Sequence, residues 1–317
     1  MIRRQILRFT VCGVAAPFLA GTALAQAPEA AGLPFRTEFE VRPSAELRAR
    51  LPEVVRAAGT ITVATNPNTP PTIFVSEDNR TLAGREIDVM SAVVRRLGLE
   101  PRWVNAGGFG NIVPGLSSGR YDAALANLSV TAERLRQVDF VSYFNSNRLG
   151  LVRAAADAPA QPASDLMTLC GQTIGAGSGT MNAETLVRQS EACRAAGRAA
   201  IEVPLFPSRP AGVQAVLSGR APGFFGPLEG LRHMVSVSRG ALAMAGDFEV
   251  PSDFIGIGLR KDSALTPVMA AALDTLIQDG TYAAILRKWD LGYGAVPRAR
   301  VNAAILEDAP AEGPRGG

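Results

Sequence analysis

The chain has few of the residues on which enzyme active sites and metal centres are most often built. Its 317 residues include one histidine, His233, and three cysteines. A Ser-His-Asp triad would depend on His233, which falls in a helix-like segment away from the polar loops that follow the predicted strands. The cysteines show no zinc-site spacing. We therefore expect no catalytic residue, no bound metal and no cofactor.

Charge of one sign and long apolar runs are also scarce. Charged residues make up 19% of the chain and the formal net charge is +3. Arg3, Arg4 and Arg8 account for that excess, so residues 26–317 are close to neutral and offer no electrostatic argument for binding nucleic acid or an anionic membrane. Hydrophobic residues make up 47%, enough for a buried core. Beyond the N-terminal segment, no stretch is long enough to span a bilayer.

Residues 1–25 have the pattern of a secretory signal peptide. A basic start is followed by a short apolar region, Phe9 to Leu24, and by small residues at "ALA". We expect export and cleavage after Ala25. A membrane anchor is the alternative, but Pro17 and Gly21 interrupt an already short apolar run.

The cysteines predict one disulfide in the exported protein. Cys12 lies inside the signal segment, which leaves Cys170 and Cys193 as an even pair. In an oxidising compartment such a pair favours a disulfide, and two separate buried thiols are the alternative.

Alternating strand and helix patterns predict an α/β fold with a mostly parallel sheet. Strand patterns cover 60–65, 101–106, 120–128, 172–177, 200–206 and 254–259, and helical patterns cover 44–59, 86–98, 111–119, 182–193 and 266–289. In the helix at 86–98, apolar residues repeat at helical spacing from Ile87 to Leu97. Pro52 is expected to split the first helix.

An internal echo indicates two similar lobes. "GLSSGRYDAAL" at 115–125 matches "AVLSGRAPGFF" at 215–225. We expect an N-terminal extension (26–55), the first part of lobe 1 (56–153), lobe 2 (158–247), a return to lobe 1 (252–296) and a disordered tail (297–317). The linker is placed near 153–164 and the return near 247–254. Ligands of such folds bind at the loops after the strands, in a cleft between the lobes.

Four segments carry a resemblance to a known family: "LAGREIDVMSAVVRRLG", "IVPGLSSGRYDAALANLSVTAERLRQVDF", "LCGQTIGAGSGT" and "DGTYAAILRKW". Together they resemble the polar amino-acid family of periplasmic solute-binding proteins of ABC importers, family 3. The resemblance implies a type II periplasmic-binding-protein fold, with two α/β lobes joined by two crossing linkers. It also implies a periplasmic monomer that binds a small carboxylate-bearing solute, most often an amino acid, and delivers it to an ABC permease.

The resemblance also assigns a carboxylate site in lobe 1. Arg134 follows Thr131 at the spacing of the family arginine that holds the α-carboxylate of the ligand. A guanidinium is always charged, and its planar fork matches a carboxylate with two hydrogen bonds. Ser129 matches a residue that donates to the same carboxylate, and Asn127 matches a residue that faces the ligand.

The resemblance also implies residues that contact the ligand side chain and residues of lobe 2 that close the site. Phe109 matches an aromatic residue that stacks on the ligand, and Asn66 matches an Asp or Asn that sets side-chain selectivity. Thr180, with Met181 beside it in "GSGTMN", matches the helix start that closes the anion site. This glycine-rich turn lacks the lysine of a phosphate-binding loop, which argues against a nucleotide.

One position departs from the family pattern. Pro227 stands where an aspartate usually pairs with the α-ammonium of the ligand, and proline cannot pair with a cation. Glu229, two residues later, is our expected substitute. The alternatives are a carboxylate ligand without an ammonium, an accessory protein that docks to an oxidoreductase or receptor, and a dehydratase-like enzyme with Glu229 as its acid.

Overall fold

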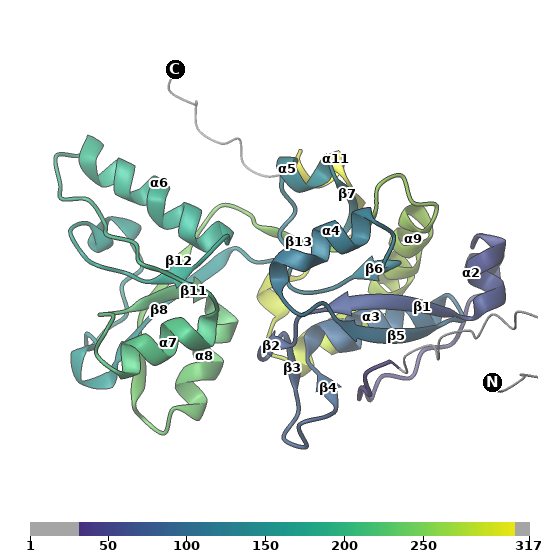
Figure 1. The fold of residues 1–317 in the computed structure, drawn as a ribbon, viewed down its shortest axis with the longest axis horizontal. Coiled ribbons are helices and arrows are strands. Elements are labelled where there is room, and N and C mark those ends of the chain that lie inside the picture. The colour runs from purple at the N-terminus through teal and green to yellow at the C-terminus, as the bar shows by residue number, and fades with distance from the viewer. Residues whose placement is uncertain (1–31, 308–317) are drawn as a thin grey trace, which may run out of the picture. The chain divides into compact units, whose positions relative to one another are not determined.

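The computed structural model describes residues 32–307, and the expected signal peptide lies outside the described residues. Lobe 1 comprises residues 32–145 and 254–307, and lobe 2 comprises residues 148–249 (Figure 1). Within the described part of the chain, no helix is long and apolar enough to cross a membrane.

Lobe 1 is built on a six-stranded mixed sheet in the order β14-β7-β13-β6-β1-β5. The strands are β1 (Thr60–Thr65), β5 (Glu100–Asn105), β6 (Ala123–Ala124), β7 (Val138–Asn145), β13 (Phe254–Arg260) and β14 (Arg300–Val301). β1 pairs in parallel with β5 and β6, but β13 pairs antiparallel with both β6 and β7. The prediction of a mostly parallel sheet is therefore wrong here. β13 arrives from the other lobe and not through a helical crossover, so it enters the sheet in the opposite direction.

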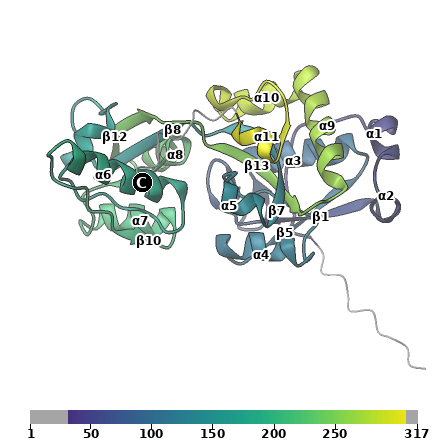
Figure 2. The same cartoon turned by 90° about the horizontal axis from the view of Figure 1, so that it is seen from above.

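Three helices of lobe 1 pack on one another beside this sheet. They are α3 (Arg85–Arg96), α9 (Leu265–Gln278) and α10 (Thr281–Lys288) (Figure 2). The apolar residues of α3 that the sequence predicts to face inward are all buried, which confirms the helical period. The first turn of α3 also buries Arg85, Glu86 and Asp88. These polar side chains carry no apolar signal, and two of them reach toward the site described below.

Shorter elements complete lobe 1. They are α1 (Ala45–Ala49), α2 (Glu53–Ala58), β2 (Asn68–Thr69), β3 (Ile73–Val75), β4 (Leu82–Ala83), α4 (Ile112–Ser117), α5 (Ala132–Leu135) and α11 (Ala303–Leu306). Pro52 divides α1 from α2, as predicted. The expected disordered tail at 297–317 is wrong for residues 300–306, because β14 pairs with β7 and Ile305 is fully buried. The polar composition after Pro297 hides these few anchoring residues.

Lobe 2 has an antiparallel sheet in the order β11-β8-β12 and a short parallel pair, β9 and β10. The strands are β8 (Arg148–Ala154), β9 (Ala176–Gly177), β10 (Leu205–Phe206), β11 (Phe224–Pro227) and β12 (Leu242–Glu249). Helices α6 (Met181–Ala195), α7 (Arg209–Leu217) and α8 (Leu228–Val237) lie around these strands (Figure 1). Two lobes of mixed helix and sheet follow, as the fold-class prediction requires.

The chain crosses between the lobes at residues 146–147 and again at 250–253. The first crossing therefore lies before the position 153–164 at which the linker was expected. β7 and β8 follow one another almost without interruption, so the apolar pattern does not mark the point where the chain leaves lobe 1. The two crossings are tied together, because the Ser146 N–H donates to the Asp253 carbonyl at 2.7 Å.

The predicted disulfide between Cys170 and Cys193 is present. It joins the loop before β9 to α6, on which Cys193 is fully buried.

We expect the double variant Cys170→Ala/Cys193→Ala to lose about 3 kcal/mol of unfolding free energy, because the bridge closes a loop with a sequence separation of 23 residues in the unfolded chain. Urea unfolding with and without reductant measures it. Reductant should lower the wild-type midpoint and leave the double variant unchanged; an insensitive wild type would contradict a stabilising bridge.

Candidate functional site

A cavity of about 140 Å³ is lined by residues of both lobes. Its polar lining consists of Asn66, Asn68, Thr69, Asn127, Ser129, Arg134, Ser146, Ser178, Thr180, Asn182, Ser208, Arg209 and Asp253. Seven of the eight residues expected to bind the ligand lie here: Asn66, Phe109, Asn127, Ser129, Arg134, Thr180 and Met181. The structure brings these residues together, and their roles toward a ligand stay predictions.

Arg134 contributes the guanidinium expected in lobe 1. Thr131 caps α5, and its hydroxyl accepts a hydrogen bond from the Arg134 N–H at 3.2 Å. The half-buried guanidinium donates from Nη1 to the Ser129 carbonyl at 2.7 Å, and its Cζ lies 5.4 Å from the centre of the Phe109 ring. Burial lowers the pKa of Arg134, while the carboxylates of Asp253 and Glu184 oppose that shift. A partly desolvated cation in a cavity wall favours an anionic partner.

Asp253 is a cavity residue that the sequence analysis did not single out. It lies on the second crossing, and its Oδ2 accepts a hydrogen bond from the Ser129 hydroxyl at 3.0 Å. Burial raises the pKa of Asp253 to about 7, against the opposing effects of the Ser129 hydrogen bond and the Arg134 charge. Its place near the start of the predicted return to lobe 1 was the available signal. Its importance depends on the packing of that segment against residues 128–130, which no local pattern reveals.

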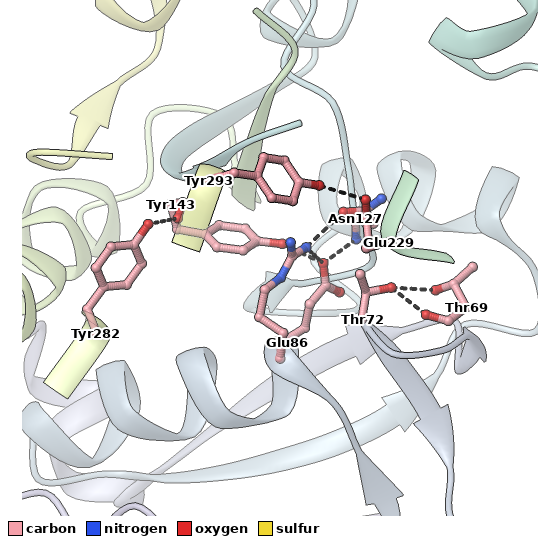
Figure 3. Close-up of polar contacts among 9 residues, drawn as sticks. Thr69, Thr72, Glu86, Asn127, Tyr143, Glu229, Tyr282 and Tyr293 are labelled. Atoms are coloured by element: carbon pink, nitrogen blue, oxygen red, sulfur yellow. Dashed lines mark hydrogen bonds and ion pairs between the residues drawn. The ribbon is translucent and has the colours of Figure 1, made fainter. Parts of the chain in front are cut away.

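Asn127 belongs to a buried polar network below the cavity. Glu86 Oε1 accepts from the Asn127 N–H at 2.7 Å, from the Tyr143 hydroxyl and from Arg85 Nη2 at 3.3 Å. Arg85 Nη2 also donates to the Asn127 side-chain oxygen at 2.9 Å. Figure 3 shows Tyr143, Glu86 and Asn127 converging on this point. Asn127 adopts a positive φ of 53°, so the network holds a turn that few residue types adopt readily.

Glu229 contacts Tyr293, whereas the sequence predicted that it would face a ligand ammonium. Its side chain is buried at the start of α8, and its Oε2 accepts a hydrogen bond from the Tyr293 hydroxyl at 2.9 Å (Figure 3). Glu229 is not among the residues that line the cavity, whereas Pro227 is. Its pairing with a ligand ammonium therefore stays a prediction without geometric support. Asp253 lines the cavity, so it is the alternative candidate for pairing with a ligand ammonium.

Lobe 2 adds a second guanidinium that was not singled out from the sequence. Arg209 begins α7, where the Ser208 hydroxyl accepts from the Ala211 N–H at 3.3 Å. Its Nη1 donates across to the Pro70 carbonyl of lobe 1 at 3.3 Å. Burial lowers the pKa of Arg209, and Glu229 opposes the shift. An arginine between two prolines was visible in the sequence, but its approach to the cavity depends on the contact between lobes.

The opposite part of the lobe 2 wall is the start of α6. Thr180 caps this helix: its hydroxyl accepts from the Ala183 N–H at 3.3 Å and donates to the Gly177 carbonyl at 2.8 Å. Met181 and Asn182, the first residues of α6, line the cavity. Among the residues that the structure describes, no group of three or more His, Cys, Asp or Glu side chains could hold a metal ion. The polar lining of the cavity suits a small polar organic molecule.

Comparison with known proteins is consistent with this geometry. The sequence profile of the bacterial extracellular solute-binding proteins, family 3, matches residues 61–292. The arginine-binding protein ArgT of Corynebacterium glutamicum is 26% identical over 82% of this chain and 84% of its own length. The lysine/arginine/ornithine-binding periplasmic protein of Escherichia coli is 29% identical over 76% of this chain and 89% of its own length.

Solved structures show the same arrangement. An ancestral arginine-binding protein bound to glutamine has a TM-score of 0.61 and 27% identity, covering 74% of this chain and 98% of that one. A periplasmic binding protein of the His/Glu/Gln/Arg/opine family from Silicibacter pomeroyi, in complex with lysine, has a TM-score of 0.60 and 26% identity, covering 74% and 99%.

Proposed function

Because the chain belongs to the bacterial extracellular solute-binding proteins, family 3, we propose that it binds a free amino acid and delivers it to an ABC permease. The observation that carries this proposal is the half-buried guanidinium of Arg134 in the wall of a cavity shared by both lobes. A guanidinium in that setting binds a carboxylate more strongly than it would in water. The amino-acid-binding relatives support the ligand class.

We propose that residues 1–25 direct export of the protein. Their signal-peptide pattern supports export, and the family is extracellular. We propose a periplasmic monomer, processed after Ala25, with an inner-membrane ABC permease as its partner.

We further propose that the ligand side chain carries oxygen rather than a cationic group. Among the described residues that line the cavity, Asp253 carries the one carboxylate, while Arg209 adds a second cation beside Arg134. Asn66, at the selectivity position, is neutral. A cationic side chain would face Arg209 and lack an acid partner once Asp253 is occupied, which is unfavourable at low dielectric. Glu133 and Glu184 line an adjoining pocket and are exposed there.

A thermal-shift panel of the common amino acids, small carboxylates and amines tests both proposals. A bound ligand raises the unfolding midpoint, because it stabilises the folded state by RT ln(1 + [L]/Kd). We expect glutamine or glutamate to bind at least tenfold more tightly than arginine, a difference of about 1.4 kcal/mol. Preference for arginine would reject the side-chain proposal and leave amino-acid binding intact. No shift with any compound would reject the binding proposal and favour an accessory protein, and product formation would indicate an enzyme.

A further inference from the structure

We propose that Asp253, on the second crossing between the lobes, receives the α-ammonium of the ligand in place of an acid at position 227. This rests on the proposed function, because it requires that Arg134 binds the α-carboxylate of an amino acid. It makes the protein a binder of zwitterions despite the proline that lobe 2 presents at the usual ammonium position.

Ser129 contacts both of the charged groups that an amino acid would bind. Its backbone carbonyl accepts from Arg134 Nη1 at 2.7 Å, and its hydroxyl donates to Asp253 Oδ2 at 3.0 Å. A cation and an anion thus flank a single residue, and both line the cavity. The carboxylate and ammonium of an α-amino acid are likewise carried on one carbon atom. A zwitterion can therefore satisfy both groups at once, with its charges matched to theirs.

The backbone holds Asp253 in this position. The Val130 N–H donates to the Phe254 carbonyl at 2.8 Å, and the Gly256 N–H donates to the Leu128 carbonyl at 3.0 Å. On the other side, the Ser146 N–H of the first crossing donates to the Asp253 carbonyl itself at 2.7 Å. The backbone of Asp253 is therefore fixed against residues 128–130 and does not belong to a loose linker. A group held in advance loses little conformational freedom when the ligand arrives.

The charges around Asp253 give the site a defined response to pH. Arg134 favours its ionised form, whereas burial and the carboxylates of Glu229 and Glu184 disfavour it, and the resulting pKa is about 7. Below that pH, the side chain is mostly protonated in the free protein. An ammonium ligand favours the ionised form, so binding must release a proton and must tighten as the pH rises through about 7. A carboxylate ligand without an ammonium favours the protonated form and should bind more tightly at low pH.

The experiment is calorimetry at about pH 6, one unit below the pKa of Asp253, in two buffers that differ in ionisation enthalpy. The ligands are L-glutamine with its deaminated analogue glutaramate, and L-arginine with its deaminated analogue, so the outcome does not depend on side-chain preference. We expect wild type to release protons on binding an amino acid. Asp253→Asn should lose at least tenfold in affinity for the amino acid, abolish the proton release and keep the deaminated analogue within about threefold.

Glu229→Gln is the matched control, because Glu229 was the ammonium partner expected from the sequence. It should keep amino-acid affinity within about threefold. Proton release should persist but be smaller than in wild type, because loss of the Glu229 charge lowers the pKa of Asp253. Loss of amino-acid binding in Glu229→Gln but not in Asp253→Asn would overturn the proposal, as would wild-type preference for the deaminated ligands. In both of those cases the proposed function would fail only if Arg134→Ala also left the affinity for the preferred ligand unchanged. Binding of none of the four ligands, together with no thermal shift from any other amino acid, would reject both proposals.

Discussion

Arg134→Ala is expected to weaken amino-acid binding at least a hundredfold, a loss of about 2.7 kcal/mol. The substitution removes a charge-assisted, two-bond partner of the ligand carboxylate and leaves that carboxylate desolvated beside Asp253, which carries the same charge. Calorimetry with the amino acid that gives the largest thermal shift measures the effect. The fold should persist, because Arg134 is half-buried and its guanidinium donates to the Ser129 carbonyl in the cavity wall and not within a hydrophobic core.

Two further variants separate charge from geometry. Arg136→Ala removes an exposed arginine from the end of the same short helix and should leave affinity unchanged. Arg134→Lys keeps the charge but loses the planar fork, so it should fall between wild type and Arg134→Ala. Equal affinity in Arg134→Ala and Arg136→Ala would show that the ligand carboxylate is bound elsewhere.

Arg134 and Asp253 differ in how far sequence can identify them. Arg134 stands three residues after Thr131, and this short local spacing carries its resemblance to the family arginine. Asp253 reaches the same cavity only because residues 254–256 pair with residues 128–130, which are more than a hundred positions away in the chain. A partner set by long-range pairing has no local pattern, so the sequence pointed to Glu229, two residues after Pro227, as the ammonium partner.

The fold shows the same division between local and long-range information. The buried face of α3 and the break at Pro52 follow from helical spacing and proline chemistry, and both were predictable. The direction of β13 and the position of the first crossing depend on which sheet each strand joins. Strands β7 and β8 are both apolar and nearly continuous, so their composition cannot say that they belong to different lobes.

The buried network beneath the cavity predicts the largest loss of stability. Glu86→Ala is expected to reduce the unfolding free energy by about 3–5 kcal/mol. The substitution removes the acceptor that the Tyr143 hydroxyl, the Asn127 N–H and Arg85 Nη2 share. The guanidinium of Arg85 is fully buried. Arg85 would keep its stacking on Phe144, 4.0 Å from the ring centre, but would lose its ion-pair partner. Urea unfolding of the ligand-free protein measures the change.

Glu86→Gln and Glu38→Ala provide the controls for this prediction. Burial raises the pKa of Glu86, so a neutral glutamine, which still accepts hydrogen bonds from Asn127 and Tyr143, should cost less than truncation. Glu38 forms an exposed ion pair with Lys288, and its removal should change stability by about 0–1 kcal/mol. Equal losses in Glu86→Ala and Glu38→Ala would contradict a stabilising network. Because Asn127 also lines the cavity, Glu86→Ala should weaken ligand binding as well, whereas Glu38→Ala should leave it unchanged.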